Sequence, residues 1–188
     1  MVVCESNEWS KKDMKLTILG AAGVRTPLII RALQRCRIGL SECALMDIDG
    51  ERLDLIAALS TPLECSGCLP FRVTCTTDAR AALTAADFVI TTFRVGGVAS
   101  RVVDERVPLE HGVLGQETAG PGGFAMGMRG IPVLLAYVKL MNEVCPEAWL
   151  INFANPSGIV TEAVTRHTDT RVVGLCNIPI GVERQLQK

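Results

Sequence analysis

The chain has 188 residues, of which 48% are hydrophobic, with 19 basic and 20 acidic side chains. This hydrophobic content excludes an intrinsically disordered protein. The net charge of -1 provides no basic field for nucleic acid or for an anionic membrane.

The most apolar run covers residues 131–138 and is far shorter than the ~20 residues of a membrane-spanning helix. Residues 1–15 lack the apolar core of a signal peptide. Eight cysteines without a secretion signal indicate reduced thiols rather than a disulfide framework. We therefore expect a soluble cytoplasmic protein with a disordered or tag-like segment at 1–13 and one domain over 14–188.

Short β-rich runs alternate with longer helical patterns. Strands are predicted at 15–19, 43–46, 72–75, 88–92, 150–153 and 171–175. Helices are predicted at 26–35, 49–59, after Asp78, near 99–109, and over 123–144 and 157–166. This alternation predicts βαβ units and hence a Rossmann-like, doubly wound parallel sheet of about six strands, with helices on both faces.

Finer features of the same pattern predict how two of the helices begin and pack. Thr26 is the expected N-cap of the first helix, and Leu53, Ile56 and Leu59 share one face of the second. Residues 60–70 have the composition of a surface loop, and residues 181–188 begin another helix. Because a domain seldom ends at such a point, we expect the C-terminus to be truncated.

The turn after the first strand is the candidate dinucleotide site. A full fingerprint reads G-x-G-x-x-G, and here Gly20 is followed by Ala22 and Arg25 at the other two glycine positions. The small Ala22 still lets the backbone approach a pyrophosphate, which the N-terminus of the next helix stabilises. We therefore predict that Gly20, Ala22, Gly23, Val24 and Arg25 bind the cofactor.

An acidic residue at the end of the second strand completes this candidate site. Asp47 is placed to accept hydrogen bonds from a ribose diol, and its charge favours NAD over NADP by repelling a 2′-phosphate. A glycine turn alone is weak evidence, because such turns also occur in sheets that bind nothing. The turn, Asp47 and the six-strand pattern together favour NAD binding.

Three later segments point to the same edge of the sheet. Arg94 and Arg101 follow the fourth strand and suit an anionic substrate, although a mobile glycine loop with solvated arginines is an equal alternative. Asn155 follows the fifth strand, and Cys176 and Asn177 follow the sixth. A lone cysteine after an apolar strand is usually a small buried hydrophobe, so its chemistry stays open on the residues alone.

Three long motifs carry a family resemblance: ADFVITTFRVGGVASRVVDERVPLEHGVLGQETAGPGG (86–123), NFANPSG (152–158) and GLCNIPIG (174–181). They resemble the NAD- and manganese-dependent glycoside hydrolases of family four, most of all the 6-phospho-β-glucosidases. The resemblance implies a Rossmann-like NAD domain followed by a larger C-terminal portion that this chain lacks. It also implies homodimers or homotetramers. The glycine turn departs from the family's usual run of glycines.

The resemblance further implies a mechanism in which NAD oxidises the C3 hydroxyl of a 6-phospho-glycoside, which makes the C2 proton acidic. Elimination, water addition and return of the hydride then complete hydrolysis, with a divalent metal, Mn2+ by resemblance, polarising the carbonyl. By the same resemblance, Cys176 is the metal ligand, Asn155 and Asn177 hold sugar hydroxyls and the cofactor, and Arg94 suits the 6-phosphate. The catalytic base and a histidine ligand are expected beyond Lys188, so the 188-residue chain alone is expected to be inactive.

Two other functions remain open at this point. A lactate- or malate-type 2-hydroxy acid dehydrogenase shares the domain but would show Asp-x-x-Arg soon after the sixth strand, where this chain has Cys176 and then Glu183-Arg184. A non-catalytic NAD-binding fragment is the second alternative.

Overall fold

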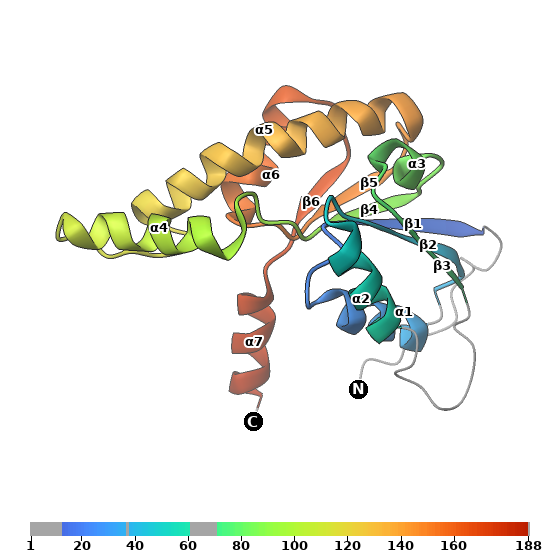
Figure 1. Cartoon of the computed structure of the whole chain (residues 1–188), viewed down its shortest axis with the longest axis horizontal. Coiled ribbons are helices and arrows are strands. Elements are labelled where there is room, and N and C mark those ends of the chain that lie inside the picture. The colour runs from blue at the N-terminus through green and yellow to red at the C-terminus, as the bar shows by residue number, and fades with distance from the viewer. Residues whose placement is uncertain (1–12, 37, 61–70, 188) are drawn as a thin grey trace.

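The computed structural model describes residues 13–36, 38–60 and 71–187 (Figure 1). The predictions of a tag-like segment at 1–13 and of a surface loop at 60–70 therefore lie almost wholly outside the described residues. The strands are β1 (Met14–Leu19), β2 (Leu40–Met46), β3 (Arg72–Thr76), β4 (Phe88–Thr91), β5 (Trp149–Asn152) and β6 (Val172–Gly174). The helices are α1 (Thr26–Cys36), α2 (Gly50–Ser60), α3 (Ala79–Leu83), α4 (Gly97–Glu110), α5 (Gly120–Val144), α6 (Ser157–His167) and α7 (Asn177–Leu186).

The strands form one parallel six-stranded sheet in the order β3-β2-β1-β4-β5-β6. This is the strand order of doubly wound dinucleotide-binding sheets, and it confirms the predicted fold class. Successive strands are added in one direction from β1 to β3 and in the other from β4 to β6, so the connections that leave β1 and β4 run to opposite sides. In sheets of this kind the ligand crevice opens at that point, outside the carboxyl ends of the strands.

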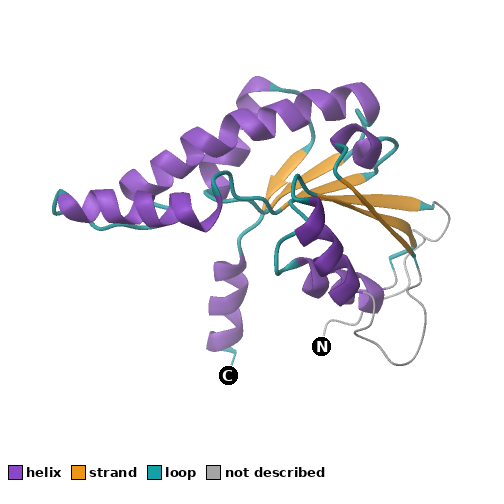
Figure 2. Ribbon diagram, viewed as in Figure 1, coloured by secondary structure: helices purple, strands orange, loops and turns teal. Residues whose placement is uncertain are grey.

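Helices cover both faces of the sheet, with α1 and α2 on one face and α3, α5 and α6 on the other (Figure 2). Two buried clusters follow from this layering, because neighbouring strand residues point to opposite faces. On β1, Leu16 and Ile18 belong to the cluster under α1 and α2, whereas Leu19 belongs to the cluster under α3, α5 and α6. The crevice therefore rests on a sheet that is buried on both sides.

The predicted helix starts and faces are partly confirmed. Asp78 caps α3 as expected, since its Oδ1 accepts the N–H of Arg80 at 2.9 Å. Leu53 and Ile56 are buried under α2, but Leu59 is 60% exposed and Ser60 is buried instead. Thr26 lies in the first turn of α1 with its hydroxyl buried and unpartnered among the described residues, so the prediction that it caps the helix is wrong.

Helix α5 runs unbroken through Pro132 for 25 residues. By length and composition alone it could cross a membrane, with a mean hydropathy of 1.4 over its most apolar window. Its apolar character has a second explanation, because Leu134, Val138 and Met141 are buried in the core beneath it. Packing on the sheet accounts for these residues, as in the core helix of an α/β domain.

Candidate functional site

A cleft of about 600 Å3 opens at the carboxyl ends of the strands. It contains every residue that the sequence analysis proposed for the site except Arg101, Cys176 and Asn177. Those cleft residues are Gly20, Ala22, Gly23, Val24, Arg25, Asp47, Arg94 and Asn155. The strands β1, β2, β4 and β5 each end at this cleft, which is why segments from residues 20 to 155 meet in one place.

The first residue of the glycine turn, Gly20, has a backbone conformation that requires glycine. Gly20 has a φ of +86°, and a Cβ there would lie 2.5 Å from the backbone nitrogen of Phe93. The turn is held against the end of β2, because the N–H groups of Gly20 and Ala21 both donate to the carbonyl of Met46, at 2.9 and 3.0 Å. Only glycine combines this φ with so close an approach.

The free amides of the turn lie at its far end. The N–H of Ala22 donates to Asp47 Oδ2 at 2.9 Å and is therefore already used inside the turn. The N–H groups of Val24 and Arg25 have no hydrogen-bond partner among the described residues and precede the first turn of α1. Unpaired amides at a helix N-terminus bind anions such as a pyrophosphate. The turn therefore fits a dinucleotide, and Val24 and Arg25 carry the two amides that are free to bind one.

Asp47 has a second role that its position in the sequence did not predict. Its Oδ2 holds Ala22, and its Oδ1 accepts the N–H of Asp49 at 3.2 Å. Each carboxylate oxygen can accept more than one hydrogen bond, so Asp47 can still accept from ribose hydroxyls. The residue is half-buried in the cleft wall and links the end of β2 to the glycine turn.

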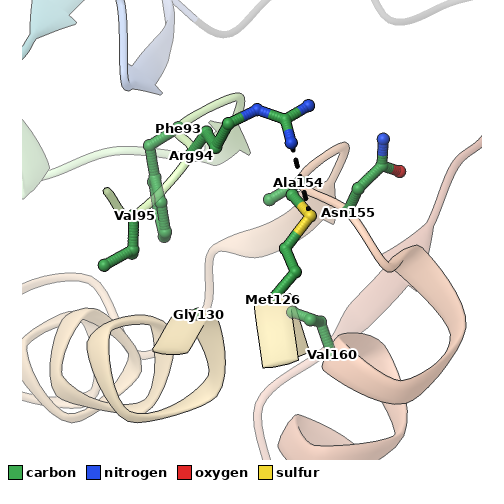
Figure 3. Close-up of a pocket in the computed structure, with 8 residues that line it drawn as sticks. All are labelled: Phe93, Arg94, Val95, Met126, Gly130, Ala154, Asn155 and Val160. Carbon is green, nitrogen blue, oxygen red and sulfur yellow. Dashed lines mark hydrogen bonds between the residues drawn. The ribbon is translucent and has the colours of Figure 1, made fainter. Parts of the chain in front are cut away.

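A charged cluster lies beside the cleft, whose wall includes its members Arg94 and Asn155, and the centre of the cluster is Glu117. Arg94 donates to Glu117 Oε1, and Arg101 Nη1 lies 3.3 Å from Oε2. Asn155 Nδ2 donates to Oε1 at 3.3 Å. Figure 3 shows Arg94 and Asn155 projecting beside Met126, whose sulfur accepts from Arg94 Nη1 at 3.4 Å. Side chains from three segments, the loop after β4, helix α4 and the turn after β5, therefore converge on one carboxylate, which the loop before α5 carries.

The sequence analysis proposed no role for Glu117. Burial raises the pKa of this carboxyl, but hydrogen bonds from Arg94 and Asn155 and the charges of Arg94 and Arg101 together bring it below its ordinary value. Glu117 is therefore ionised at neutral pH. Its signal in the sequence was its place within GQETAGPGG, between two predicted arginine ligands and a glycine run.

A buried amide fixes the turn that carries Asn155. Asn152 is fully buried, and its Oδ1 accepts from Thr91 Oγ1 at 2.8 Å and from the N–H of Ala154 at 3.1 Å. Its Nδ2 donates to Thr161 Oγ1 at 3.1 Å. Asn152 therefore joins β4, the turn after β5 and α6. A buried amide with all its partners made holds one local geometry.

Cys176 and Asn177 lie apart from this cleft. Both are exposed at the start of α7, which stands away from the sheet in Figure 1. The alternative that Cys176 is a small buried hydrophobe is therefore wrong. Among the described residues no group of three histidine, cysteine or acidic side chains could hold a metal ion. These residues alone do not fit a complete manganese site, and Cys176 is a single candidate ligand.

The strand order and the cleft define a Rossmann-type α/β protein with a dinucleotide-binding turn. Residues 15–188 match a family described as "Family 4 glycosyl hydrolase". The chain belongs to this family of glycosyl hydrolases, as the motifs had indicated.

Two bacterial relatives show how much of such a protein the chain represents. It is 42% identical over 182 residues to a probable 6-phospho-beta-glucosidase of Bacillus subtilis (strain 168) and 44% identical over 177 residues to a 6-phospho-beta-glucosidase of Escherichia coli (strain K12). These matches cover 94% and 92% of this chain but only 41% and 39% of the relatives. The chain thus spans about two-fifths of their length.

Solved structures of known proteins have the same fold, and this chain is more similar to a phospho-glucosidase than to a dehydrogenase. The 6-phospho-beta glucosidase from Thermotoga maritima, solved with NAD and glucose-6-phosphate, matches with a TM-score of 0.85 at 32% identity. That match covers 92% of this chain and 42% of the Thermotoga chain. The lactate dehydrogenase from Eimeria maxima matches 88% of this chain and 44% of its own with a TM-score of 0.58 at 16% identity, which shows a shared fold alone.

Proposed function

We propose that this chain is the NAD-binding N-terminal part of a 6-phospho-β-glucosidase. The whole enzyme would hydrolyse 6-phospho-glycosides by oxidation at C3, elimination, water addition and re-reduction. The observation that carries the proposal is the cleft, which one edge of the sheet lines with a dinucleotide turn and with Arg94 and Asn155, both bound to Glu117 beside it. The family relationship then favours a phospho-glycoside over a 2-hydroxy acid as the substrate.

At the cofactor end, the chain's own residues bind and orient. Val24 and Arg25 offer backbone N–H groups for the pyrophosphate, and Asp47 accepts from the adenosine ribose. Bound NAD supplies the hydride acceptor for oxidation of the sugar. Because Asp47 also holds Ala22, the ribose contact and the shape of the turn depend on the same carboxylate.

At the substrate end, Arg94 and Arg101 share Glu117 without using all of their donors. A guanidinium carries five N–H groups in a fixed plane, so each arginine can hold Glu117 and still donate to a 6-phosphate. Asn155 lies against the same carboxylate and can contact sugar hydroxyls with its amide oxygen. Glu117, kept ionised by its partners, lies beside the cleft residues Arg94 and Asn155, and we propose that it accepts a hydrogen bond from a sugar hydroxyl.

A divalent metal is a further part of the proposal. The Thermotoga maritima enzyme has been solved with manganese, NAD+ and glucose-6-phosphate. We propose Cys176 as a thiolate ligand of Mn2+ and Asn177 as its neighbour on the substrate, both at the exposed start of α7. The metal would supply Lewis acidity at the sugar carbonyl. A cytoplasmic location and assembly into homodimers or homotetramers are further proposals for the whole enzyme.

Calorimetry on the 188-residue chain tests the function directly. We expect NAD to bind, and glucose 6-phosphate to bind in the presence of NAD more tightly than glucose. Replacement of Arg94 by methionine should remove the preference for the phosphate, because a thioether has no N–H groups to donate to it. Binding of lactate or malate in place of glucose 6-phosphate would favour the dehydrogenase alternative. Binding of NAD alone would favour the non-catalytic fragment.

A further inference from the structure

Tyr137 is the single tyrosine of the chain, and neither the motifs nor the cleft roles above include it. It lies on α5, is half-buried, and forms part of the wall of the cleft. Its helix lies on the sheet face that α3 and α6 also cover, opposite α1 and α2 (Figure 2), and Tyr137 packs against the buried cluster of that face.

One residue separates Tyr137 from the glycine turn. The backbone of Phe93 lies against Gly20, so closely that a Cβ at Gly20 would lie 2.5 Å from its nitrogen. The ring of Phe93 in turn contacts the ring of Tyr137, with centroids 5.6 Å apart and planes tilted by 51°. Tilted ring pairs of this kind are favourable, so Phe93 holds the tyrosine ring beside the turn.

The tyrosine hydroxyl is available to a ligand. No described residue forms a hydrogen bond with it, and it is absent from the described buried atoms that lack a partner, which are Thr26 Oγ1 and Arg129 Nε. The hydroxyl therefore reaches solvent, and the cleft is the space that this side chain lines. Burial, and after it the negative charge of Asp47, raises the pKa of Tyr137, so the phenol keeps its proton and is a donor.

These contacts place a phenolic donor in the wall of the cleft that the dinucleotide turn and Asp47 also line. Phosphate oxygens accept hydrogen bonds and donate none near neutral pH, and they match such a donor. We propose that Tyr137 is a cofactor-binding residue whose hydroxyl donates a hydrogen bond to the adenosine diphosphate half of NAD. The inference rests on the proposed NAD binding and adds a contact from α5, which covers the opposite face of the sheet from α1 (Figure 2).

The test compares the wild-type chain with Tyr137→Phe, which keeps the ring and its contact with Phe93. Titration calorimetry with NAD, ADP and nicotinamide mononucleotide separates the two halves of the cofactor. We expect Tyr137→Phe to bind NAD and ADP roughly tenfold more weakly than wild type, which is the effect of losing one hydrogen bond to a charged group. Its affinity for nicotinamide mononucleotide should be unchanged. Phe124→Leu, at an exposed position of α5 outside the cleft, is the matched control and should bind all three like wild type.

A second readout uses the single tyrosine. Labelling with 3-fluorotyrosine gives one fluorine resonance, which should shift with ADP and stay in place with nicotinamide mononucleotide. Equal NAD and ADP affinities of wild type and Tyr137→Phe, or a resonance that moves only with the mononucleotide, would overturn the role of Tyr137 and leave NAD binding intact. Failure of the wild-type chain to bind NAD at all would overturn both.

Discussion

The carboxylate of Asp47 accepts the backbone N–H of Ala22 at 2.9 Å, which ties the end of β2 to the glycine turn after β1. One side chain therefore shapes the turn and faces the cleft. Loss of this acid should affect the cofactor site twice, through the ribose contact and through the position of the neighbouring amides.

Removal of the carboxylate in Asp47→Ala should weaken NAD binding by about 1–3 kcal/mol, the range for hydrogen bonds to a charged group. Titration calorimetry measures the loss. Asp54→Ala removes an exposed acid from α2 outside the cleft and should bind NAD like wild type. An unchanged NAD affinity in Asp47→Ala would contradict the assignment.

Gly20→Ala should destabilise the fold, because a φ of +86° costs an alanine about 1–2 kcal/mol and its Cβ would also collide with Phe93. Gly158→Ala is the matched control. It lies exposed in the first turn of α6 with open space where a Cβ would be, so it should stabilise by about 0.5–1 kcal/mol. Urea unfolding of the two variants checks the opposite signs.

The ion cluster around Glu117 predicts a pH dependence of stability. Its folded-state pKa is lowered from 4.5, so its contribution is present above pH 4.5 and is lost as the pH falls through the lowered pKa. Wild type should therefore lose unfolding free energy below pH 4.5 more steeply than Glu117→Gln. Parallel slopes for the two proteins between pH 6 and pH 3 would show that the carboxylate is not stabilised by its arginines.

Two of the cysteines, the buried Cys43 and the exposed Cys176, are expected to differ in their reactivity towards alkylating reagents. Burial, followed by the charges of Cys75 and Glu42, raises the pKa of Cys43 to about 12. Cys176 is exposed. Iodoacetamide at pH 8 should therefore modify Cys176 and spare Cys43, as mass spectrometry of the folded chain can show.

Cys176→Ser should leave the melting temperature and NAD binding of the chain unchanged, because the side chain is exposed and outside the cleft. In a full-length enzyme with the same N-terminal part, the substitution should abolish Mn2+-dependent turnover. Wild-type activity and metal dependence in that variant would mean that Cys176 is not a ligand.

Asn152 allows a separate test of how the turn before α6 is held. Asn152→Leu should destabilise the chain by about 1–3 kcal/mol, since Thr91 and Thr161 lose their buried partner. Thr165→Val removes an exposed hydroxyl from the same helix and is the control. Thermal unfolding compares the two; equal melting temperatures would show that the amide network contributes nothing to stability.

The sequence by itself determined the sheet, the glycine turn and the position of Asp47. Alternation of apolar strands with helical patterns leaves few topologies open, because parallel strands need right-handed helical crossovers. Because all strands run parallel, the residues that directly follow them lie at the same edge of the sheet, the one formed by the carboxyl ends of the strands. Asp47, Arg94 and Asn155 therefore reached the cleft as the pattern predicted.

Only the tertiary structure decided which side chains meet there. Glu117 and Asn155 are 38 residues apart, and their contact depends on the path of a loop and on where a 25-residue helix begins. Tyr137 lines the cleft because of how α5 packs on its face of the sheet, which no local pattern specifies. Cys176 follows a strand just as Asn155 does, yet it lies outside the cleft, because β6 is the edge strand of the sheet and the helix after it points away. The hydrophobic periodicity of a segment determines whether it forms a helix or a strand and which of its faces is buried. Which side chains of different elements contact one another depends on how the whole chain packs.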